Sequence, residues 1–172
     1  MRPSKDQYFI EMAKLVATRG TCLRRKVGCV LVNARGHVIA TGYNGVAAGL
    51  PHCNHAEVDK VYTQYSMELS RVVTHRTFKY PNACSGATLS SGTGLDSCEA
   101  IHGEQNALLQ CKDVFEMHTA YVTAKPCVSC MKLLMNTSCK RIVYLEDYPH
   151  PKTDELALKA NIKLEKFNAS IS

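Results

Sequence analysis

The sequence predicts a three-layer α/β/α domain, in which helices cover both faces of a five-stranded mixed sheet. Apolar residues repeat with a helical period in some segments and form short strand-like runs in others. These two kinds of segment interleave in the order α-β-β-α-β-α-β-α-β. The chain has 172 residues, of which 45% are hydrophobic, so it is large enough to bury one core. We therefore expect a single domain over residues 1–172.

The first helix is expected directly after Ser4, which pairs with Gln7 in the pattern of a capping box. Gly20 is placed to end this helix. Its apolar face would consist of Phe9, Met12, Ala13 and Val16. Strands are expected over residues 27–32 and 37–41, with a turn at 33–36 between them. The first half of the chain therefore predicts a helix followed by a β-hairpin.

The second half alternates helices with strands. Helices are expected at 103–111, 128–136 and 153–160, and strands at 119–124, 141–145 and 162–167. Residues 50–99 form an insertion before them, with a possible helix near 58–72 and a flexible tip at 90–94. The insertion thus interrupts an otherwise regular α/β pattern.

Two short motifs supply the chemistry, His102-Gly103-Glu104 and Pro126-Cys127-Val128-Ser129-Cys130. A catalytic zinc ion takes three protein ligands and keeps one position open for water, and His102, Cys127 and Cys130 fit that count. Each motif opens an expected helix on one face of the sheet, where the two can meet. Helix N-termini favour thiolates over thiols, which helps metal binding at neutral pH. A closed structural site would need a fourth ligand.

Glu104 follows His102 by two residues, so its carboxylate can approach a zinc-activated water without becoming a fourth ligand. Zinc lowers the pKa of its water towards about 7, and a carboxylate placed there can carry the proton to a substrate. The combination of H-x-E with P-C-x-x-C resembles the signature of the zinc deaminases, which use this glutamate as general acid and base. We therefore expect an enzyme with Glu104 as its catalytic residue.

Composition limits the setting. No apolar run is long enough to span a membrane, and the N-terminal segment does not have the pattern of a signal peptide. Nine cysteines in such a chain indicate reduced thiols and metal sites rather than disulfides. We expect a cytoplasmic protein, or one of the host cytoplasm if the chain is viral, with no membrane partner. The net charge of +6 suits a small phosphorylated ligand.

Beyond the zinc motifs, nearly the whole chain resembles the deoxycytidylate (dCMP) deaminases of the cytidine deaminase superfamily. The resemblance rests on further segments at residues 21–28, 41–45, 52–53 and 144–148. Gly42-Tyr43-Asn44-Gly45 is the most telling, because other deaminases share the zinc motifs whereas this tetrapeptide after the second strand resembles the dCMP enzymes. The resemblance implies a cytidine-deaminase-like fold and the conversion of dCMP to dUMP and ammonia, which supplies the precursor of thymidylate.

The resemblance also implies substrate contacts. Asn44 would hydrogen-bond the sugar, the N–H of Gly103 would contact the base, and Tyr148 would stack on the cytosine ring. The family usually has alanine where this chain has Gly103. Arg24 and Lys26 lie near where the family places its 5′-phosphate, and an arginine fork suits phosphate geometry. The alternative for Tyr148 is that it merely caps the end of a strand. The alternative for Arg24 and Lys26 is that they belong to a solvated basic face.

Regulation is implied in the same way. The family is a homohexamer that dCTP activates and dTTP inhibits, with Mg²⁺ as a possible companion of these nucleotides. The effector site includes the Gly-Tyr-Asn-Gly element, so Gly42, Tyr43 and Gly45 are the expected effector-binding residues. A tight turn is the alternative explanation of the same tetrapeptide.

Several family members carry a second, structural zinc in the insertion. The expected ligands here are Cys22, Cys53, Cys84 and Cys98, with His52, His55 or His75 as substitutes. A closed site would hold together a loop that is poor in apolar residues. The alternative is a set of free thiols.

Two other functions compete with dCMP deamination. A deaminase acting on bases in RNA or DNA needs a basic groove and exposed aromatic side chains, and a competence-type protein would act through nucleic acid binding. The chain has no tryptophan and its basic residues are scattered. A binding protein also has no evident need for Glu104. Nucleic acid is therefore the less favoured partner.

Overall fold

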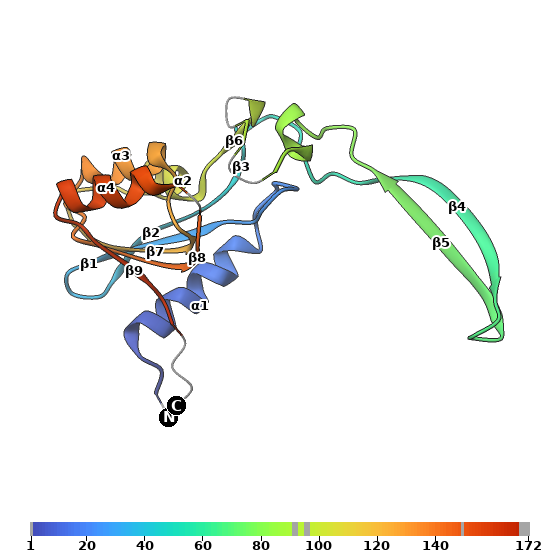
Figure 1. Cartoon of the computed structure of the whole chain (residues 1–172), viewed down its shortest axis with the longest axis horizontal. Helices are drawn as coiled ribbons and strands as arrows, with labels where there is room; N and C mark the ends of the chain where they lie inside the picture. Colours follow the sequence, from blue (N-terminus) through green and yellow to red (C-terminus); the bar gives the residue numbers. More distant parts are fainter. Residues whose placement is uncertain (1, 91–92, 95–96, 149, 169–172) are drawn as a thin grey trace.

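A five-stranded sheet with the strand order β2-β1-β7-β8-β9 forms the centre of the molecule (Figure 1). The computed structural model describes residues 2–90, 93–94, 97–148 and 150–168. The sheet strands are β1 (Gly28–Asn33), β2 (Val38–Tyr43), β7 (Met117–Ala124), β8 (Arg141–Glu146) and β9 (Lys163–Lys166). β1 pairs antiparallel with β2 and β7, whereas β7, β8 and β9 run parallel. The predicted five-stranded mixed sheet is confirmed.

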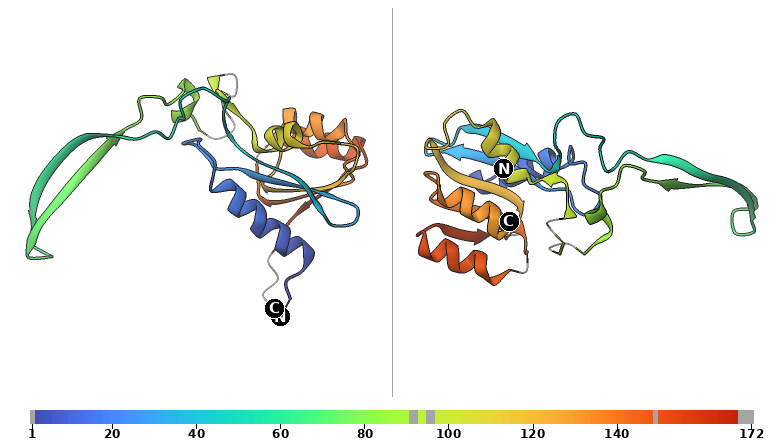
Figure 2. Two further views of the ribbon diagram at one scale, coloured as in Figure 1. Left: turned by 180° about the vertical axis from the view of Figure 1, so that it is seen from behind. Right: turned by 90° about the horizontal axis from the view of Figure 1, so that it is seen from above.

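Helices cover both faces of this sheet (Figures 1 and 2). One face carries α1 (Lys5–Ala17), and the other carries α2 (Gly103–Gln110), α3 (Val128–Met135) and α4 (Pro151–Lys159). Side chains of β1 alternate between two cores, as the period of a strand requires. Val30 packs with the α1 residues, while Leu31 packs with residues of α2, α3 and α4. The three-layer α/β/α prediction is therefore confirmed.

The first helix forms for the local reasons that the sequence suggests. The hydroxyl of Ser4 accepts a hydrogen bond of 3.1 Å from the N–H of Gln7, which satisfies one unpaired donor of the first turn. Phe9 and Ala13 of the predicted apolar face are buried, and Ile10 joins them. The helix ends at Ala17, three residues before Gly20, so the predicted end is close to the observed one.

The predicted helix near residues 58–72 is wrong. These residues lie in an antiparallel hairpin of β4 (Glu57–Ser66) and β5 (Arg71–Lys79), which extends away from the body as an arm (Figures 1 and 2). Both strands are rich in valine, threonine and aromatic residues, which favour pleated strands over helices. Pairing of the two strands then satisfies the backbone groups that face between them, while the outward-facing groups meet solvent.

The rest of the insertion joins the arm to the body. A short helix, η1 (Ser85–Thr88), follows the arm, and β3 (Gly45–Val46) pairs with β6 (Ala100–Ile101) to close the insertion at its base. Of the predicted flexible tip, Ser91 and Gly92 lie outside the described residues. Across the described part of the chain, no helix is both long enough and apolar enough to cross a membrane.

Candidate active site

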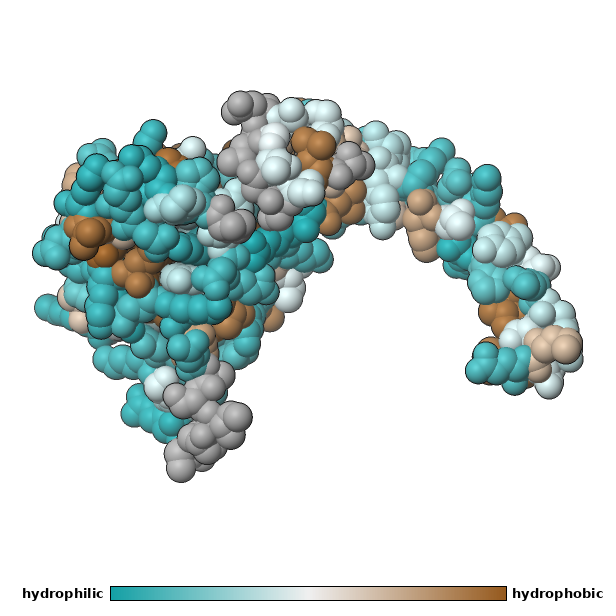
Figure 3. All heavy atoms as spheres, viewed as in Figure 1, coloured by the Kyte–Doolittle hydropathy of each residue, from teal (hydrophilic) through white to brown (hydrophobic). Residues whose placement is uncertain are grey.

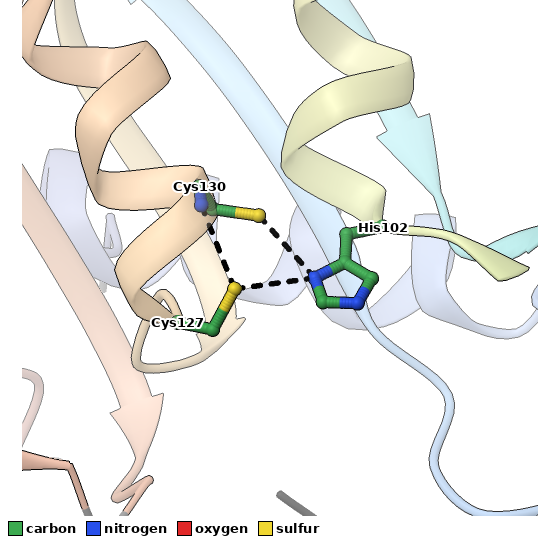
Figure 4. Close-up of side chains that lie close together, drawn as sticks. All are labelled: His102, Cys127 and Cys130. Atoms are coloured by element: carbon green, nitrogen blue, oxygen red, sulfur yellow. Dashed lines mark hydrogen bonds between the residues drawn. The ribbon is translucent and has the colours of Figure 1, made fainter. Parts of the chain in front are cut away.

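The start of α2 and the start of α3 bring the three predicted metal ligands together (Figure 4). The Nδ1 atom of His102 lies 3.4 Å from the Sγ of Cys127 and 3.3 Å from the Sγ of Cys130. In the part of the chain that the structure describes, this is the one set of three potential ligands whose donor atoms all lie within 4.8 Å of one another. The prediction of this cluster from sequence is confirmed.

Local structure explains why these side chains converge. His102 and Cys127 are the N-cap residues of α2 and α3, so their extended backbone turns each side chain back over the first turn of its helix. The Sγ of Cys127 accepts a hydrogen bond of 3.5 Å from the N–H of Cys130. The N–H of His102 in turn donates to Oε1 of Gln105 at 2.9 Å. Both loops are therefore held before any metal binds.

The cluster fits a zinc ion. Nitrogen and sulfur ligands at zinc lie about 2.0–2.3 Å from the metal, so tetrahedral neighbours are roughly 3.5 Å apart. The distances from His102 Nδ1 to the two sulfurs match that separation. Hydrogen bonds from the Cys130 thiol and then from His102 lower the pKa of Cys127 to about 4, in spite of burial, whereas the contact with Cys127 and burial raise the pKa of Cys130, so zinc binding must release the second proton. Three ligands leave the fourth position open.

Glu104 lies beside this cluster and is buried, with 4% of its surface exposed. Burial raises the pKa of its carboxyl group above the ordinary value. A carboxyl group poised to take up a proton and release it again suits general acid and base catalysis near neutral pH. It lines the same pocket as His102 and Cys127.

The pocket brings together most of the predicted substrate-binding residues. Arg24, Asn44, Gly103 and Tyr148 all line it, together with His102 and Glu104. Lys26 is exposed and does not line it. The guanidinium of Arg24 donates to the carbonyl oxygens of Ser90 and Thr93, the latter at 2.9 Å, so the insertion holds a residue that lines the pocket.

Sequence analysis missed one cationic residue of the pocket, Lys125, and ranked Arg25 behind its neighbours Arg24 and Lys26. Arg25 forms an ion pair with Glu146, and the Nζ of Lys125 lies 2.6 Å from a carboxylate oxygen of Asp154. Lys125 directly precedes the Pro-Cys-x-x-Cys motif, a position that could have drawn attention to it. The entrance therefore carries three cations near the cluster rather than the two that were predicted.

Asn44 also has a structural task. Its Oδ1 accepts from the N–H of Val27 at 2.8 Å, and its Nδ2 donates to the carbonyl oxygen of Arg25 at 2.7 Å. An amide can make four hydrogen bonds, so one N–H and one lone pair stay available to a ligand. Asn44 thus fixes the loop that carries Arg25 while it faces the pocket.

The two glycines of the Gly-Tyr-Asn-Gly element and Gly103 are tightly packed, Gly42 and Gly103 against backbone and Gly45 against a side chain. A Cβ on Gly42 would lie 2.2 Å from the backbone nitrogen of Ala107 in α2. A Cβ on Gly45 would meet the hydroxyl of Thr21 at 2.6 Å, and one on Gly103 would meet the carbonyl oxygen of Val27 at 2.9 Å. Tyr43 is half-buried, and its carbonyl oxygen accepts from Asn106 at 2.7 Å. Close packing explains Gly42 without any ligand.

The four cysteines of the expected second site gather at the base of the insertion. Cys53 and Cys84 are buried, while Cys22 and Cys98 are half-buried and also line the pocket. Burial raises the pKa of Cys84, but hydrogen bonds from the Glu99 N–H and from the Cys53 and Cys98 thiols outweigh it and lower the pKa overall. Their donor atoms do not meet within the distance that brings His102, Cys127 and Cys130 together. None of the three substitute histidines belongs to a compact cluster of this kind.

Comparison with known proteins identifies the family. The sequence matches the family described as the cytidine and deoxycytidylate deaminase zinc-binding region over residues 3–93 and 62–146. The chain belongs to this family. A deoxycytidylate deaminase of Mycobacterium phage D29 is 34% identical over 147 residues, which cover 83% of this deaminase-family chain and 95% of the phage protein.

Other relatives are longer. A deoxycytidylate deaminase of Schizosaccharomyces pombe is 34% identical over 169 residues, which cover 96% of this chain and 45% of the yeast protein. The chain thus spans about half the length of the yeast relative. Among solved structures, the dCMP deaminase of cyanophage S-TIM5 in complex with dCMP and dUMP has a TM-score of 0.66 at 20% identity, over 97% of this chain and 99% of the phage chain. That likeness supports the fold of this deaminase family.

Proposed function

We propose that this chain catalyses the hydrolytic deamination of dCMP to dUMP and ammonia. The observation that carries the proposal is the shared pocket, in which Glu104 lies beside the cluster of His102, Cys127 and Cys130. Arg24, Arg25 and Lys125 line the same pocket and suit a phosphate group. Relatives that are described as deoxycytidylate deaminases support the choice of substrate.

The chemistry divides between the metal and the chain. His102, Cys127 and Cys130 would hold a zinc ion, which would supply an activated water at neutral pH. Glu104 takes a proton from the attacking water and delivers it to N3 of the cytosine ring while oxygen adds at C4. Glu104 then carries the remaining proton of the added oxygen to the amino nitrogen, and the bond from C4 to that nitrogen breaks to release ammonia and leave a carbonyl group at C4. The raised pKa of Glu104 suits both transfers.

The remaining side chains place the substrate. Tyr148 would stack its aromatic ring on the base. The backbone N–H of Gly103 would donate a hydrogen bond to the edge of the base. The free N–H and lone pair of Asn44 suit a sugar hydroxyl. Arg24, Arg25 and Lys125 would bind the 5′-phosphate, whereas Lys26 points to solvent and would contribute little.

Turnover of three nucleotides tests this proposal. Loss of the cytosine absorbance band is measured with dCMP, deoxycytidine and CMP, using zinc-loaded protein. We expect turnover of dCMP and roughly 10–100-fold lower kcat/KM for deoxycytidine, because a hydrogen bond to a charged group is worth about 1.5–3 kcal/mol. Arg24→Gln should raise KM for dCMP, and Lys26→Gln, its matched control, should not. Intact dCMP with zinc bound would refute the proposal.

We also propose that the chain works as a homohexamer. In this proposal dCTP activates the enzyme and dTTP inhibits it, and Mg²⁺ accompanies the bound nucleotides. The Gly42-Tyr43-Asn44-Gly45 element supports this, since it is the family element associated with effector binding. Dose–response curves of dCMP turnover with each nucleotide test the regulation. Because coupling is reciprocal, dCMP should tighten dCTP binding by the same factor that dCTP tightens dCMP binding. Equal turnover with and without both nucleotides would exclude regulation.

A second zinc at Cys22, Cys53, Cys84 and Cys98 is the last part of the proposal. The shared hydrogen bonds of Cys84 with Cys53 and Cys98 support it. We expect two zinc ions per chain in the wild type and one in Cys84→Ser, measured by elemental analysis. Cys111→Ser, which removes a half-buried cysteine at the C-terminal end of α2 and outside both sets of ligands, should retain two. A wild-type content of one zinc per chain would contradict a second site.

A further inference from the structure

Arg25 is held at the pocket through both its backbone and its side chain. Its carbonyl oxygen accepts a hydrogen bond of 2.7 Å from the Nδ2 of Asn44. Its guanidinium group donates through Nη2 to the carboxylate of Glu146, the last residue of β8. The two partners lie 19 and 121 residues away in the chain, so the fold and not the local sequence fixes this side chain. Arg25 also lines the pocket.

Ion pairs are common on the surface of this protein. Polar and charged side chains cover most of the face of the body that Figure 3 shows. Exposed pairs, such as Lys159 with Glu155, contribute little because water screens them. The pair of Arg25 with Glu146 is different, because 24% of the arginine side chain is exposed, against 64% for Lys159. Its place at the pocket therefore separates this pair from the surface pairs.

The guanidinium group of Arg25 lies near Tyr148, another residue of the pocket. Burial and then the negative charge of Cys127 raise the pKa of Tyr148. The positive charges of Arg24 and Arg25 oppose this rise, which requires that both guanidinium groups lie close to the tyrosine hydroxyl. The segment that follows β8 thus approaches the two arginines, and Glu146 is the carboxylate of that segment that binds one of them.

The ion pair leaves most of the guanidinium group available to a ligand. An arginine has five N–H donors in a planar fork, and among the described residues this fork makes one hydrogen bond, from Nη2 to Glu146. A guanidinium group that is held at one edge can still present another edge to a phosphate group in a bidentate arrangement. Ordering a long side chain upon binding reduces affinity. An arginine that is ordered beforehand avoids that loss.

We propose that Glu146 is a positioning residue, which holds the guanidinium group of Arg25 at the pocket so that it binds the 5′-phosphate of dCMP. This inference rests on the proposed function and adds to it a residue that does not touch the substrate. Glu146 does not line the pocket, and 62% of its side chain is exposed. Water therefore screens the repulsion between its carboxylate and the phosphate, so the gain from an ordered Arg25 outweighs that repulsion.

The sign of one substitution separates positioning from simple repulsion. If the carboxylate of Glu146 only repelled phosphate, Glu146→Ala would tighten dCMP binding. We expect about 3–10-fold weaker binding instead, because the freed side chain of Arg25 must be ordered by the ligand. Calorimetry on the zinc-loaded Glu104→Gln protein measures dCMP binding without turnover. Glu146→Gln, which keeps an oxygen acceptor for Arg25, should bind dCMP more tightly than Glu146→Ala does.

Asp147→Ala is the matched control. Asp147 is the neighbouring carboxylate, and it forms its ion pair with Lys166, which does not line the pocket. Its removal takes away the same charge but leaves Arg25 in place, so dCMP affinity should stay within about twofold of the parent protein. In an Arg25→Gln background, Glu146→Ala should cause no further loss, because the side chain that it positions is absent.

Turnover provides the second readout. In protein that retains Glu104, Glu146→Ala should lower the ratio of kcat/KM for dCMP to kcat/KM for deoxycytidine, which has no phosphate. A general loosening of the fold would lower both values alike. Equal or tighter dCMP binding in Glu146→Ala, the same loss in the Arg25→Gln background, or no dCMP binding in the Glu104→Gln protein would overturn the proposal. Binding of dCMP without turnover in protein that retains Glu104 would refute deamination alone, since the calorimetric comparison still decides the role of Glu146.

Discussion

The hydroxyl of Thr153 donates a hydrogen bond of 3.1 Å to the carbonyl oxygen of Pro126, and both residues are buried. Thr153 lies in the first turn of α4, and Pro126 directly precedes the zinc ligand Cys127. Through this hydrogen bond, α4 holds in place the loop that presents Cys127.

Thr153→Val should loosen this loop, because valine keeps the shape of threonine but leaves the buried oxygen of Pro126 without a donor. A buried acceptor without a partner costs about 1–3 kcal/mol. Loss of a group that supports a metal ligand typically weakens metal binding about 10–100-fold. Denaturant unfolding and zinc competition measure the two effects. Thr153→Ser, which keeps the hydroxyl, should bind zinc nearly as the wild type does; equal zinc affinity in Thr153→Val would contradict the role of the hydrogen bond.

Gly42→Ala should displace α2, since its Cβ would lie 2.2 Å from the backbone nitrogen of Ala107. Backbone atoms of a packed helix cannot move aside alone, so we expect weaker zinc binding through a shifted His102 and a loss of stability of a few kcal/mol, about the range of overpacking. Gly45→Ala meets only the side-chain hydroxyl of Thr21, at 2.6 Å, which can rotate. Comparable zinc affinity and melting temperature in the two variants would show that Gly42 does not set the position of α2.

Asn44→Asp should destabilise the protein, because the aspartate cannot donate to the carbonyl oxygen of Arg25 as the Asn44 amide does. We expect a loss of about 1–3 kcal/mol in the free energy of unfolding at neutral pH. Asn33→Asp is the matched control, since the side chain of Asn33 only accepts hydrogen bonds, from the N–H groups of Arg35 and His37. Urea unfolding compares the variants. Equal losses in both would show that the Asn44 donor has no special role.

The ion pair of Asp6 with Arg141 should make stability depend on pH. Both guanidinium nitrogens Nη1 and Nη2 lie 2.7 Å from the carboxylate, and these hydrogen bonds hold the pKa of Asp6 below its ordinary value of 3.8. The folded pKa is the lower one, so the contribution is present above about pH 4 and disappears as the pH falls through the folded pKa.

Asp6→Asn should therefore be less stable than the wild type at neutral pH, and the difference should shrink as the pH falls from about 5 to about 2. Urea unfolding of the zinc-free proteins measures it, because acid also releases zinc from cysteine ligands. The difference should be modest, since the pair is partly exposed. A difference that stays constant across this pH range would contradict the assignment.

The layered body could be predicted from sequence because its elements follow one period each. The apolar repeat of α1 and the runs in β1 and β7 match the faces that the structure buries. The arm shows the limit of this approach. Val58, Val61, Tyr65 and Val72 also fall at helical spacing, and only their pairing with residues 71–79 decides for a hairpin. The spacing of apolar residues within one segment does not reveal which other segment it pairs with.

The residues of the site also fall into two groups, those that sequence motifs identify and those that only the fold brings together. His102, Glu104, Cys127 and Cys130 could be found because two local motifs carry their whole geometry. The cations of the pocket depend on the folded loops instead. Arg24, Arg25 and Lys26 are adjacent in the chain, and the structure turns the first two towards the pocket and the third to solvent. The support of the Cys127 loop by Thr153 likewise joins segments 27 residues apart.

The most direct test of the proposed reaction is product formation by the zinc-loaded protein and its Glu104→Gln variant. Glutamine keeps the shape of the buried side chain but cannot transfer a proton. We predict that the wild type converts dCMP to equal amounts of dUMP and ammonia, and that Glu104→Gln binds as much zinc yet loses at least ~100-fold in rate. Absence of dUMP from the wild type with zinc bound, or full activity in Glu104→Gln, would contradict the mechanism.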